Sequence, residues 1–557
     1  MRYARENLRW NGWGPRDVFF DTHGRDRELW ALIADSLGLG ELPSTPALPF
    51  ERVRVPEGRL SSEVIAELGR ALGGEGARVR TDDYERAFHA LGQSYPDALR
   101  ARRGELGTAP DAVLYVESER EVLAVLALCD ARGIAAIPFG GGSSVVGGVE
   151  GRPGPGHIGA VTIDTTRLRQ LLEVDPVSHT ARAQAGIYGP VLEEELGARG
   201  FTLGHYPQSF EFSTLGGWIA ARGAGQLSNR YGSADKFLVA ARLATPRGEL
   251  RTLAFPTSAA GPNLNHVIAG SEGTLGVITE ATVKVHPAPE ARRIGAFLFR
   301  ELESGTDAVR RLVQEEVGAA MIRLSDPHET RFFGELRQAL EPGGATRLAE
   351  RGLGLLGFGD KCLMLVAFEG SEARVRSGFR RAVALATRAG GLYVGEGPGR
   401  SWWKRRFEMP YLRDPILDHG LGVDTVETST EWSNLPRLYH AVREALRQAV
   451  EAGHRRGIVM MHVSHSYLDG ASLYFTFLFA RDLGRELEQW HGIKEAASRA
   501  ISENGGTISH HHGVGVDHAG WMRAEKGALG MDLLAAAKAR LDPNGIMNPG
   551  KLLGPRP

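Results

Sequence analysis

The chain has 557 residues, which is too long for one ordinary core, so two or more packing units are expected. Its 66 basic and 67 acidic residues give a net charge of -1, which lacks the basic footprint of a nucleic-acid-binding protein. We therefore expect no nucleic-acid partner.

The cysteine content and the first residues of the chain indicate where in the cell the protein is expected. Cys129 and Cys362 are too few for a disulfide framework or a cysteine zinc site. Residues 1–14 lack the apolar stretch of a secretion signal, and no uninterrupted run of 18 apolar residues occurs. We expect a cytoplasmic protein with no targeting signal, in peripheral contact with a membrane at most.

The first two segments differ in pattern. Residues 1–107 mix short helical patterns with proline-punctuated loops and predict an N-terminal wrap. A strand over 111–116, a helix over 118–133 and a strand over 135–139 then form a βαβ-like unit that ends in a glycine loop. Short β-branched runs continue to Pro287, so we predict a cofactor domain over 108–287.

Residues 288–500 alternate charged helical patterns with strands and predict a substrate-facing cap domain. Within it, the run 472–479 alternates, so Phe475 and Phe477 are expected in a core and Tyr474 on the opposite face. Residues 501–557 hold a Gly/His turn and a helix over 531–541, and we expect them to complete the active site and return to the cofactor domain.

The glycine loop 139–148 follows a predicted strand. Its glycine N–H groups are able to approach a pyrophosphate closely, and a tight structural turn is the alternative. The loop fails the G-x-G-x-x-G frame because Val145 stands at the third glycine, which disfavours a nicotinamide site. The segment 545–552 is similar to a P-loop, but Leu552 replaces the residue that would hold magnesium, so we reject it.

Three motifs, at 138–148, 208–225 and 270–287, resemble in order and spacing the FAD-binding domain of vanillyl-alcohol-oxidase-type flavoproteins. The resemblance implies an α+β fold, with a two-subdomain FAD-binding domain of the vanillyl-alcohol-oxidase (PCMH) type and an α+β cap domain with an antiparallel sheet. Ser143 and Ser144 stand where some members tether the flavin through a histidine, so we predict non-covalent FAD. The FAD contacts that it implies are Pro138, Phe139, Gly140, Gly141, Gly142, Ser143, Ser144, Gln208, Ser209, Phe210, Glu211, Phe212, Ser213, Thr214, Ala221, Arg222, Gly223, Ala224, Glu272, Gly273, Thr274, Leu275, Gly276, Val277 and Ile278.

Segments along most of the chain, among them 10–14, 209–218, 427–432 and 509–515, are similar to the alkylglycerone-phosphate synthases, a family of ether-lipid enzymes. This resemblance implies an enzyme that exchanges the acyl chain of 1-acyl-dihydroxyacetone phosphate for a long-chain fatty alcohol, with FAD in a redox-neutral role. It also implies a homodimer with an apolar tunnel that opens toward a membrane.

A histidine triple, His510–His511–His512, lies at a glycine turn. Neutral imidazole titrates near pH 6.5, so the triple suggests proton handling or a metal, with a surface histidine run as the alternative. Consecutive side chains point in different directions, so we expect them not to share one ion. The synthase resemblance assigns all three histidines and Tyr474 to the active site.

The resemblance also raises two arginines above ordinary surface ion pairs. An arginine fork recognises a phosphate bidentately, so Arg413 is the predicted phosphate ligand and Arg323 a catalytic helper. The segment 402–406 combines tryptophan with basic residues, which is typical of a membrane interface or of a partly buried loop.

His462 and His465 are spaced as a metal pair could be. Related 2-hydroxy-acid dehydrogenases carry further ligands where Tyr474 and His510 stand, so we predict no metal and structural roles for His462 and His465. The alternative function is an FAD-linked oxidase or dehydrogenase of a 2-hydroxy acid of the lactate or glycolate type, because a fold does not fix its chemistry. The missing ligands count against it. A flavin-binding protein without catalysis is a third class, disfavoured because the histidine and tyrosine positions are intact.

Overall fold

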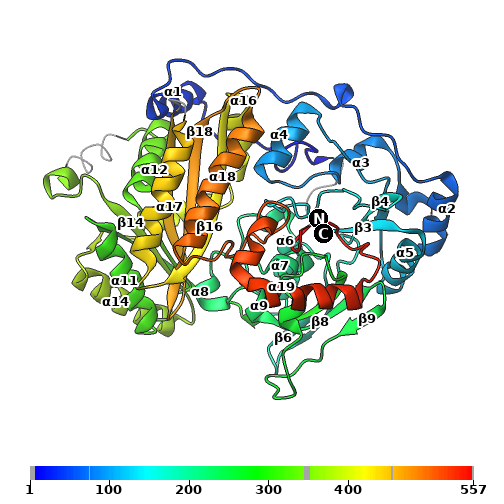
Figure 1. Cartoon of the computed structure of the whole chain (residues 1–557). Coiled ribbons are helices and arrows are strands. Elements are labelled where there is room, and N and C mark those ends of the chain that lie inside the picture. The colour runs from blue at the N-terminus through cyan, green and yellow to red at the C-terminus, as the bar shows by residue number, and fades with distance from the viewer. Residues whose placement is uncertain (1–6, 75, 344–351, 453–455, 555–557) are drawn as a thin grey trace.

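The computed structural model describes residues 7–74, 76–343, 352–452 and 456–554; residues 1–6, at the start of the segment examined for a secretion signal, lie outside these ranges. Two lobes are visible in Figure 1. One holds a four-stranded and a five-stranded sheet, and the other a seven-stranded sheet covered by helices. The predicted α+β fold with a large antiparallel sheet in the cap is confirmed.

The four-stranded sheet has the order β1-β2-β4-β3. Helix α5, Glu119–Arg132, begins after Ser118, whose side chain accepts from the backbone N–H of Glu121, and ends at the left-handed Gly133. The predicted strand–helix–strand order is correct, but the next strand, β4, inserts between β2 and β3 and pairs parallel with both. The strands are β1 Val79–Arg80, β2 Ala112–Tyr115, β3 Ile134–Phe139 and β4 Gly159–Asp164.

The five-stranded sheet is antiparallel throughout, in the order β5-β6-β10-β8-β9. Its strands are β5 Leu171–Asp175, β6 Thr180–Gln184, β8 Leu238–Thr245, β9 Gly248–Arg251 and β10 Val277–Lys284. Helix α7, Leu215–Ala221, packs on β10 and contributes Trp218 and Ile219 to the core of this sheet. The second glycine motif lies between β6 and β8, and the third begins before β10 and includes that strand.

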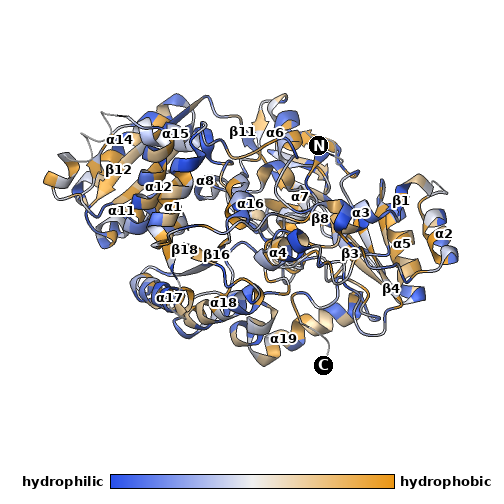
Figure 2. Ribbon diagram, turned by 90° about the horizontal axis from the view of Figure 1, so that it is seen from above, coloured by the Kyte–Doolittle hydropathy of each residue, from blue (hydrophilic) through white to orange (hydrophobic). Residues whose placement is uncertain are grey.

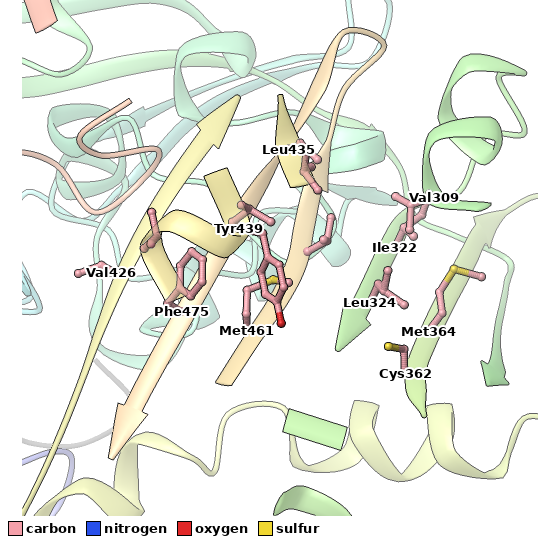
Figure 3. Close-up of a cluster of buried hydrophobic side chains, with 14 of the residues drawn as sticks. Val309, Ile322, Leu324, Cys362, Met364, Val426, Leu435, Tyr439, Met461 and Phe475 are labelled. Carbon is pink, nitrogen blue, oxygen red and sulfur yellow. The ribbon is translucent and has the colours of Figure 1, made fainter. Parts of the chain in front are cut away.

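The seven-stranded sheet has the order β15-β12-β14-β13-β17-β18-β16. One face is covered by α11 Leu302–Gln314, α14 Glu372–Arg388, α17 Leu435–Val450 and α18 Glu486–Glu503. Figure 3 shows the core beneath them, where Phe475 and Tyr439 approach Met461. The strands are β12 Ala291–Phe299, β13 Met321–Ser325, β14 Cys362–Gly370, β15 Leu392–Tyr393, β16 Leu421–Glu431, β17 Gly457–Ser466 and β18 Gly470–Ala480.

The opposite face of this sheet is only partly covered by helices. Helices α1 Asp26–Leu37, α12 Pro327–Leu340 and α16 Pro410–Asp418 pack on Met460 and Leu478 at one end of it. The N-terminal segment then runs across the top of the molecule from α1 to α2, Ser62–Ala71, in the other lobe (Figure 1). Helix α15, Gly397–Arg405, packs on β12 and β14 at the other end, and the part of the face between them is turned toward the first lobe.

The C-terminal segment ends at the four-stranded sheet. Helix α19, Met522–Leu541, is followed by Met547, which bridges to Ala136 of β3 in parallel. Figure 2 shows apolar strands inside the lobes and polar outer surfaces on helices such as α17 and α18. Among the described residues, every helix falls short of the length and apolar character that a membrane span requires.

Candidate active site

A cavity of about 540 Å³ lies between the two lobes, a size typical of a small-molecule site. The glycine loop after β3, the turn before α7 and the end of α7 form one wall. The opposite wall is formed by the part of the seven-stranded sheet that no helix covers, where Arg323, Tyr474 and Thr476 line the cavity. Trp13 and Gln93 of the N-terminal wrap also line the cavity.

The glycine loop packs directly against the turn before α7. A Cβ atom on Gly141 would lie 1.8 Å from the carbonyl oxygen of Phe212, and one on Gly140 would lie 2.3 Å from Oγ1 of Thr214. Only glycine permits this approach, so the two motifs form one continuous cradle of exposed backbone. A cradle of this kind fits the pyrophosphate of a dinucleotide cofactor.

Nineteen of the 25 predicted cofactor contacts line the cavity, and the other six do not. Phe210 stacks on Phe407 and Trp218, and Phe212 packs edge-on against Trp13, because aromatic side chains here serve the core. Arg222 turns outward from the left-handed end of α7 to pair with Asp235. The six predicted contacts that lie outside the cavity lining are Phe210, Glu211, Phe212, Arg222, Thr274 and Leu275.

The sheet wall is built on a row of three paired residues. Tyr474 of β18 is in register with His462 of β17 on one side and with Glu427 of β16 on the other. Its ring stacks on His462 at 4.8 Å, and its hydroxyl donates to Oγ1 of Thr425 at 3.3 Å. Phe475 is fully buried on the opposite face, as the alternation predicts.

Glu427 anchors the histidine triple. Its carboxylate, 1% exposed, accepts hydrogen bonds from the backbone N–H groups of His510, His511 and His512, the last at 2.8 Å, and from the hydroxyl of Ser509 at 2.8 Å. These four donors fix the turn onto the sheet, because a buried carboxylate needs partners of this kind.

A second carboxylate holds the far end of the same turn. Glu272, from the third glycine motif of the cofactor lobe, accepts from the N–H groups of Val514 and Gly515, both at 2.6 Å. Burial raises the pKa of Glu272 to about 7, although both hydrogen bonds lower it. The turn is therefore fixed by one carboxylate from each lobe.

The three imidazoles do not diverge as predicted. Nδ1 of His510 lies 2.9 Å from Nδ1 of His511. His511 and His512 line the cavity, while His510 lies behind them and its Nε2 is 2.6 Å from the hydroxyl of Tyr467. Burial is the main cause that holds the pKa of all three histidines below the ordinary value, to about 4 for His512.

His462 and His465, which the sequence assigns to structural roles, both line the cavity. A β-bulge between Ser464 and Ser466 places His465 at a left-handed φ of 50°. Bulges often redirect a side chain beside an active site. Here the ring of His465 stacks on His510 at 5.2 Å and meets His511 edge-on at 4.9 Å.

Both predicted arginines lie on the cavity wall. The guanidinium of Arg413 donates to the carbonyl oxygen of Gln93 at 2.8 Å and to the side-chain oxygen of the same residue. Within the described chain, Nε of Arg413 is buried without a hydrogen-bond partner, which suits an anionic ligand. Arg323 pairs with Glu329 at 3.1 Å, and His462 bonds the same carboxylate oxygen at 2.9 Å.

Glu427, His510 and His511 are also close enough to hold a metal ion, with ligand atoms within 4.8 Å of one another. The carboxylate of Glu427 already accepts from four donors, so its lone pairs are used by the turn. Glu427 therefore serves to hold the histidine turn on the sheet and not as a metal ligand.

The segment 402–406 is half-buried, apart from Lys404, which is exposed. Trp402 lies on the cavity wall at the end of α15, Gly397–Arg405. Trp403 is covered by the guanidinium groups of Arg292 and Arg406, at 4.0 Å and 3.9 Å. The interpretation of this segment as a partly buried one fits the structure.

Sequence reasoning missed Glu427, Gln93 and Tyr467. The local signal for Glu427 was an acidic residue in a run of threonine and valine. A charged side chain within a buried strand needs a partner, so this pattern pointed to a contact. Gln93 and Tyr467 carry no comparable signal, since their partners Arg413 and His510 come from distant segments.

Comparison with known families supports the two-lobe interpretation. The family described as FAD binding domain matches residues 110–254, and the C-terminal domain of the FAD linked oxidases matches residues 288–552. Solved p-cresol methylhydroxylase, at 14% identity, shares the fold with a TM-score of 0.67 over 90% of this chain and 98% of its own. The protein is thus an FAD-binding protein of the FAD-linked oxidase class.

Full-length relatives place it more narrowly. Alkyldihydroxyacetonephosphate synthase from Dictyostelium discoideum is 33% identical over 98% of this chain and 94% of its own, and that from Trypanosoma brucei brucei is 31% identical over 99% and 93%. A solved alkyldihydroxyacetonephosphate synthase aligns with a TM-score of 0.84 at 31% identity, covering 98% of both chains. The chain belongs to the alkyldihydroxyacetonephosphate synthase family.

Proposed function

We propose that this protein exchanges the acyl chain of 1-acyl-dihydroxyacetone phosphate for a long-chain fatty alcohol, which gives a 1-alkyl ether and a fatty acid. One observation carries the proposal: a fixed pair of histidines, Tyr474 and two arginines share a cavity with the glycine cradle of an FAD-binding domain. The names of the full-length relatives agree with it.

The residues that would hold FAD are those that line the cavity from 138–144, 208–214, 221–224 and 272–278. When bound, FAD supplies an electron sink and ends each turnover in the oxidation state in which it began. Ser143 and Ser144 supply no histidine for a covalent link, so we propose non-covalent binding.

Arg413 is the proposed phosphate ligand, because its guanidinium is oriented by Gln93 and keeps a buried N–H for an anion. Arg323 lies on the same wall, and its charge is partly balanced by Glu329. A phosphate bound between them directs the ketone and C1 of the substrate toward the histidines.

The ketone acidifies the neighbouring C1–H bond, so a positioned base is able to remove that proton. We assign this role to His511, whose Nδ1 is held by His510 and whose ring lies on the cavity wall. Its lowered pKa keeps the imidazole neutral, which is the form that accepts a proton. Tyr474 stacks on His511 with ring centroids 5.8 Å apart and assists by a neutral hydroxyl.

Apolar side chains continue the cavity away from the histidines. Phe333, Leu412, Ile416 and Val423 line it between α12, α16 and β16, and we propose that they hold the acyl and alkyl chains. Exclusion of water there keeps hydrolysis from competing with the alcohol.

The cytoplasmic setting, the homodimer and the peripheral membrane contact are part of the same proposal. Long-chain substrates partition into membranes, which supports a membrane contact, and both tryptophans of segment 402–406 are half-buried beside the exposed Lys404. Light scattering of the purified protein tests the homodimer, and flotation with phospholipid vesicles tests the membrane contact.

The function itself is tested by incubation of the purified protein with palmitoyl-dihydroxyacetone phosphate and labelled hexadecanol. We expect a labelled ether and one equivalent of palmitate. Absence of the ether, together with bleaching of the flavin by lactate or glycolate, would favour the 2-hydroxy-acid oxidase alternative, which the C-terminal domain it shares with FAD linked oxidases makes the natural competitor.

A further inference from the structure

Two hydrogen bonds lead from the cavity to the surface. His511 lines the cavity, and its Nδ1 lies 2.9 Å from Nδ1 of His510. The other nitrogen of His510, Nε2, lies 2.6 Å from the hydroxyl of Tyr467. Tyr467 stands in the hairpin between β17 and β18 and is 37% exposed.

The hairpin tip is held firmly. The backbone N–H of Tyr467 donates to the carbonyl oxygen of Gly470 at 2.7 Å, and the indole N–H of Trp432 donates to the carbonyl oxygen of Tyr467 at 3.1 Å. Gln314 of α11 donates to the carbonyl oxygen of Leu468 at 2.9 Å. The backbone from which the Tyr467 side chain reaches His510 is therefore fixed.

The proposed reaction releases a proton inside the protein. The C1–O bond to the acyl group breaks, a C1–O bond to the alcohol forms, and the O–H bond of the alcohol breaks. The fatty acid leaves as a carboxylate near neutral pH, so each turnover yields one proton and no net oxidation. C1 ends with two hydrogens, as it began, because the proton that the base removes from it is replaced before the ether leaves. The proton released in excess originates in a buried cavity and needs a route to water.

We infer that His510 and Tyr467 are this route, and that Tyr467 is the proton exit of the site. The inference rests on the proposed function. His511 takes a proton at Nε2 and passes the one on Nδ1 to His510, and His510 passes the one on Nε2 to the hydroxyl of Tyr467, which gives its own to water. Each group ends neutral, with the proton of each imidazole on its other nitrogen. Exchange of these ring protons with solvent between turnovers restores the starting tautomers.

The surroundings of the path suit a neutral relay. Burial raises the pKa of the Tyr467 phenol, so it transfers a proton without becoming an anion. Burial also lowers the pKa of His510 and His511, which disfavours trapping of the proton as imidazolium. The ring of His465 stacks on His510 and keeps it in line between its two partners.

The test is Tyr467→Phe, which keeps the ring and removes the relaying hydroxyl. With palmitoyl-dihydroxyacetone phosphate and hexadecanol, we expect kcat to fall about tenfold or more, since proton transfer commonly contributes that much or more. Ether made in D2O reports the path directly. The wild-type product should carry deuterium at C1, because His511 exchanges its proton with solvent, and the variant product should carry markedly less.

Leu468→Ala is the matched control, because it alters the same tip without touching the bond to His510. It should retain the wild-type kcat and deuterium content. In Tyr467→Ala, added imidazole should restore kcat, an effect that a purely structural role would not produce.

Wild-type kcat and wild-type deuterium content in Tyr467→Phe would overturn the inference, as would failure of imidazole to rescue Tyr467→Ala. A wild-type protein that forms no ether would instead overturn the proposed function.

Discussion

Glu427 and Glu272 hold opposite ends of one turn. Glu427 comes from the cap sheet and accepts from three successive N–H groups at the histidine triple, and Glu272 comes from the cofactor lobe and accepts from the two that follow Gly513. The position of the histidines relative to the cradle is therefore set by both lobes together, which matters because catalysis depends on placement within fractions of an ångström.

Glu427→Gln should release the near end of this turn. The carboxamide presents an NH2 group to backbone donors, and each N–H left without an acceptor costs about 1–3 kcal/mol. We expect ether formation to fall about a hundredfold, the usual effect of a misplaced catalytic group. The melting temperature should also fall. Glu431→Gln at the exposed end of β16 serves as the control, and equal activity in both variants would refute the anchor.

Gly141→Ala should abolish FAD binding. The added Cβ would lie 1.8 Å from the carbonyl oxygen of Phe212, so the cradle must open. Visible flavin absorbance per polypeptide measures the result, and Gly334→Ala, at a helical position with open space around the added atom, is the control. A yellow Gly141→Ala protein with full flavin content would show that the cradle is not the cofactor site.

The fold and part of the site were predictable because their signals are local. Alternation placed Tyr474 and Phe475 on opposite faces, and glycine spacing marked the cradle before any contact was known. The place of β4 between β2 and β3 was not predictable, since parallel pairing depends on distant segments. For the same reason Gln93 and Glu427 were missed: each acts on a partner far along the chain.

Acid should destabilise the protein through the buried histidines. Burial lowers the pKa of His512 to about 4, whereas in the unfolded chain it is about 6.5. Between these values the unfolded chain binds more protons, so stability falls as pH falls from 6.5 toward 4, by about 3 kcal/mol for His512 alone.

The variant His512→Asn should therefore show a shallower fall of melting temperature over this pH range than the wild type. His440→Asn, on the exposed face of α17, should follow the wild-type curve. If the melting temperatures of His512→Asn and the wild type fell equally with pH, burial of His512 would not be a cause of the acid destabilisation.

Gln93→Ala should weaken phosphate recognition without harming the chemistry. Arg413 would lose the side-chain oxygen that accepts from its guanidinium and keep only the backbone carbonyl of residue 93 as an acceptor there. We expect KM for acyl-dihydroxyacetone phosphate to rise about tenfold, equivalent to about 1.4 kcal/mol, with kcat little changed. Steady-state kinetics measures both constants, with Gln448→Ala, an exposed position on α17, as the control. A fall in kcat with an unchanged KM would contradict a role for Gln93 in phosphate binding.

The most direct test of the account is the rate of ether formation in His511→Ala that has been shown to retain its flavin. His511 lies on the cavity wall opposite the cradle, so its removal should leave FAD content at the wild-type level and reduce the labelled ether to background. Ether formation at the wild-type rate in this yellow variant would remove His511 from the reaction and contradict the account.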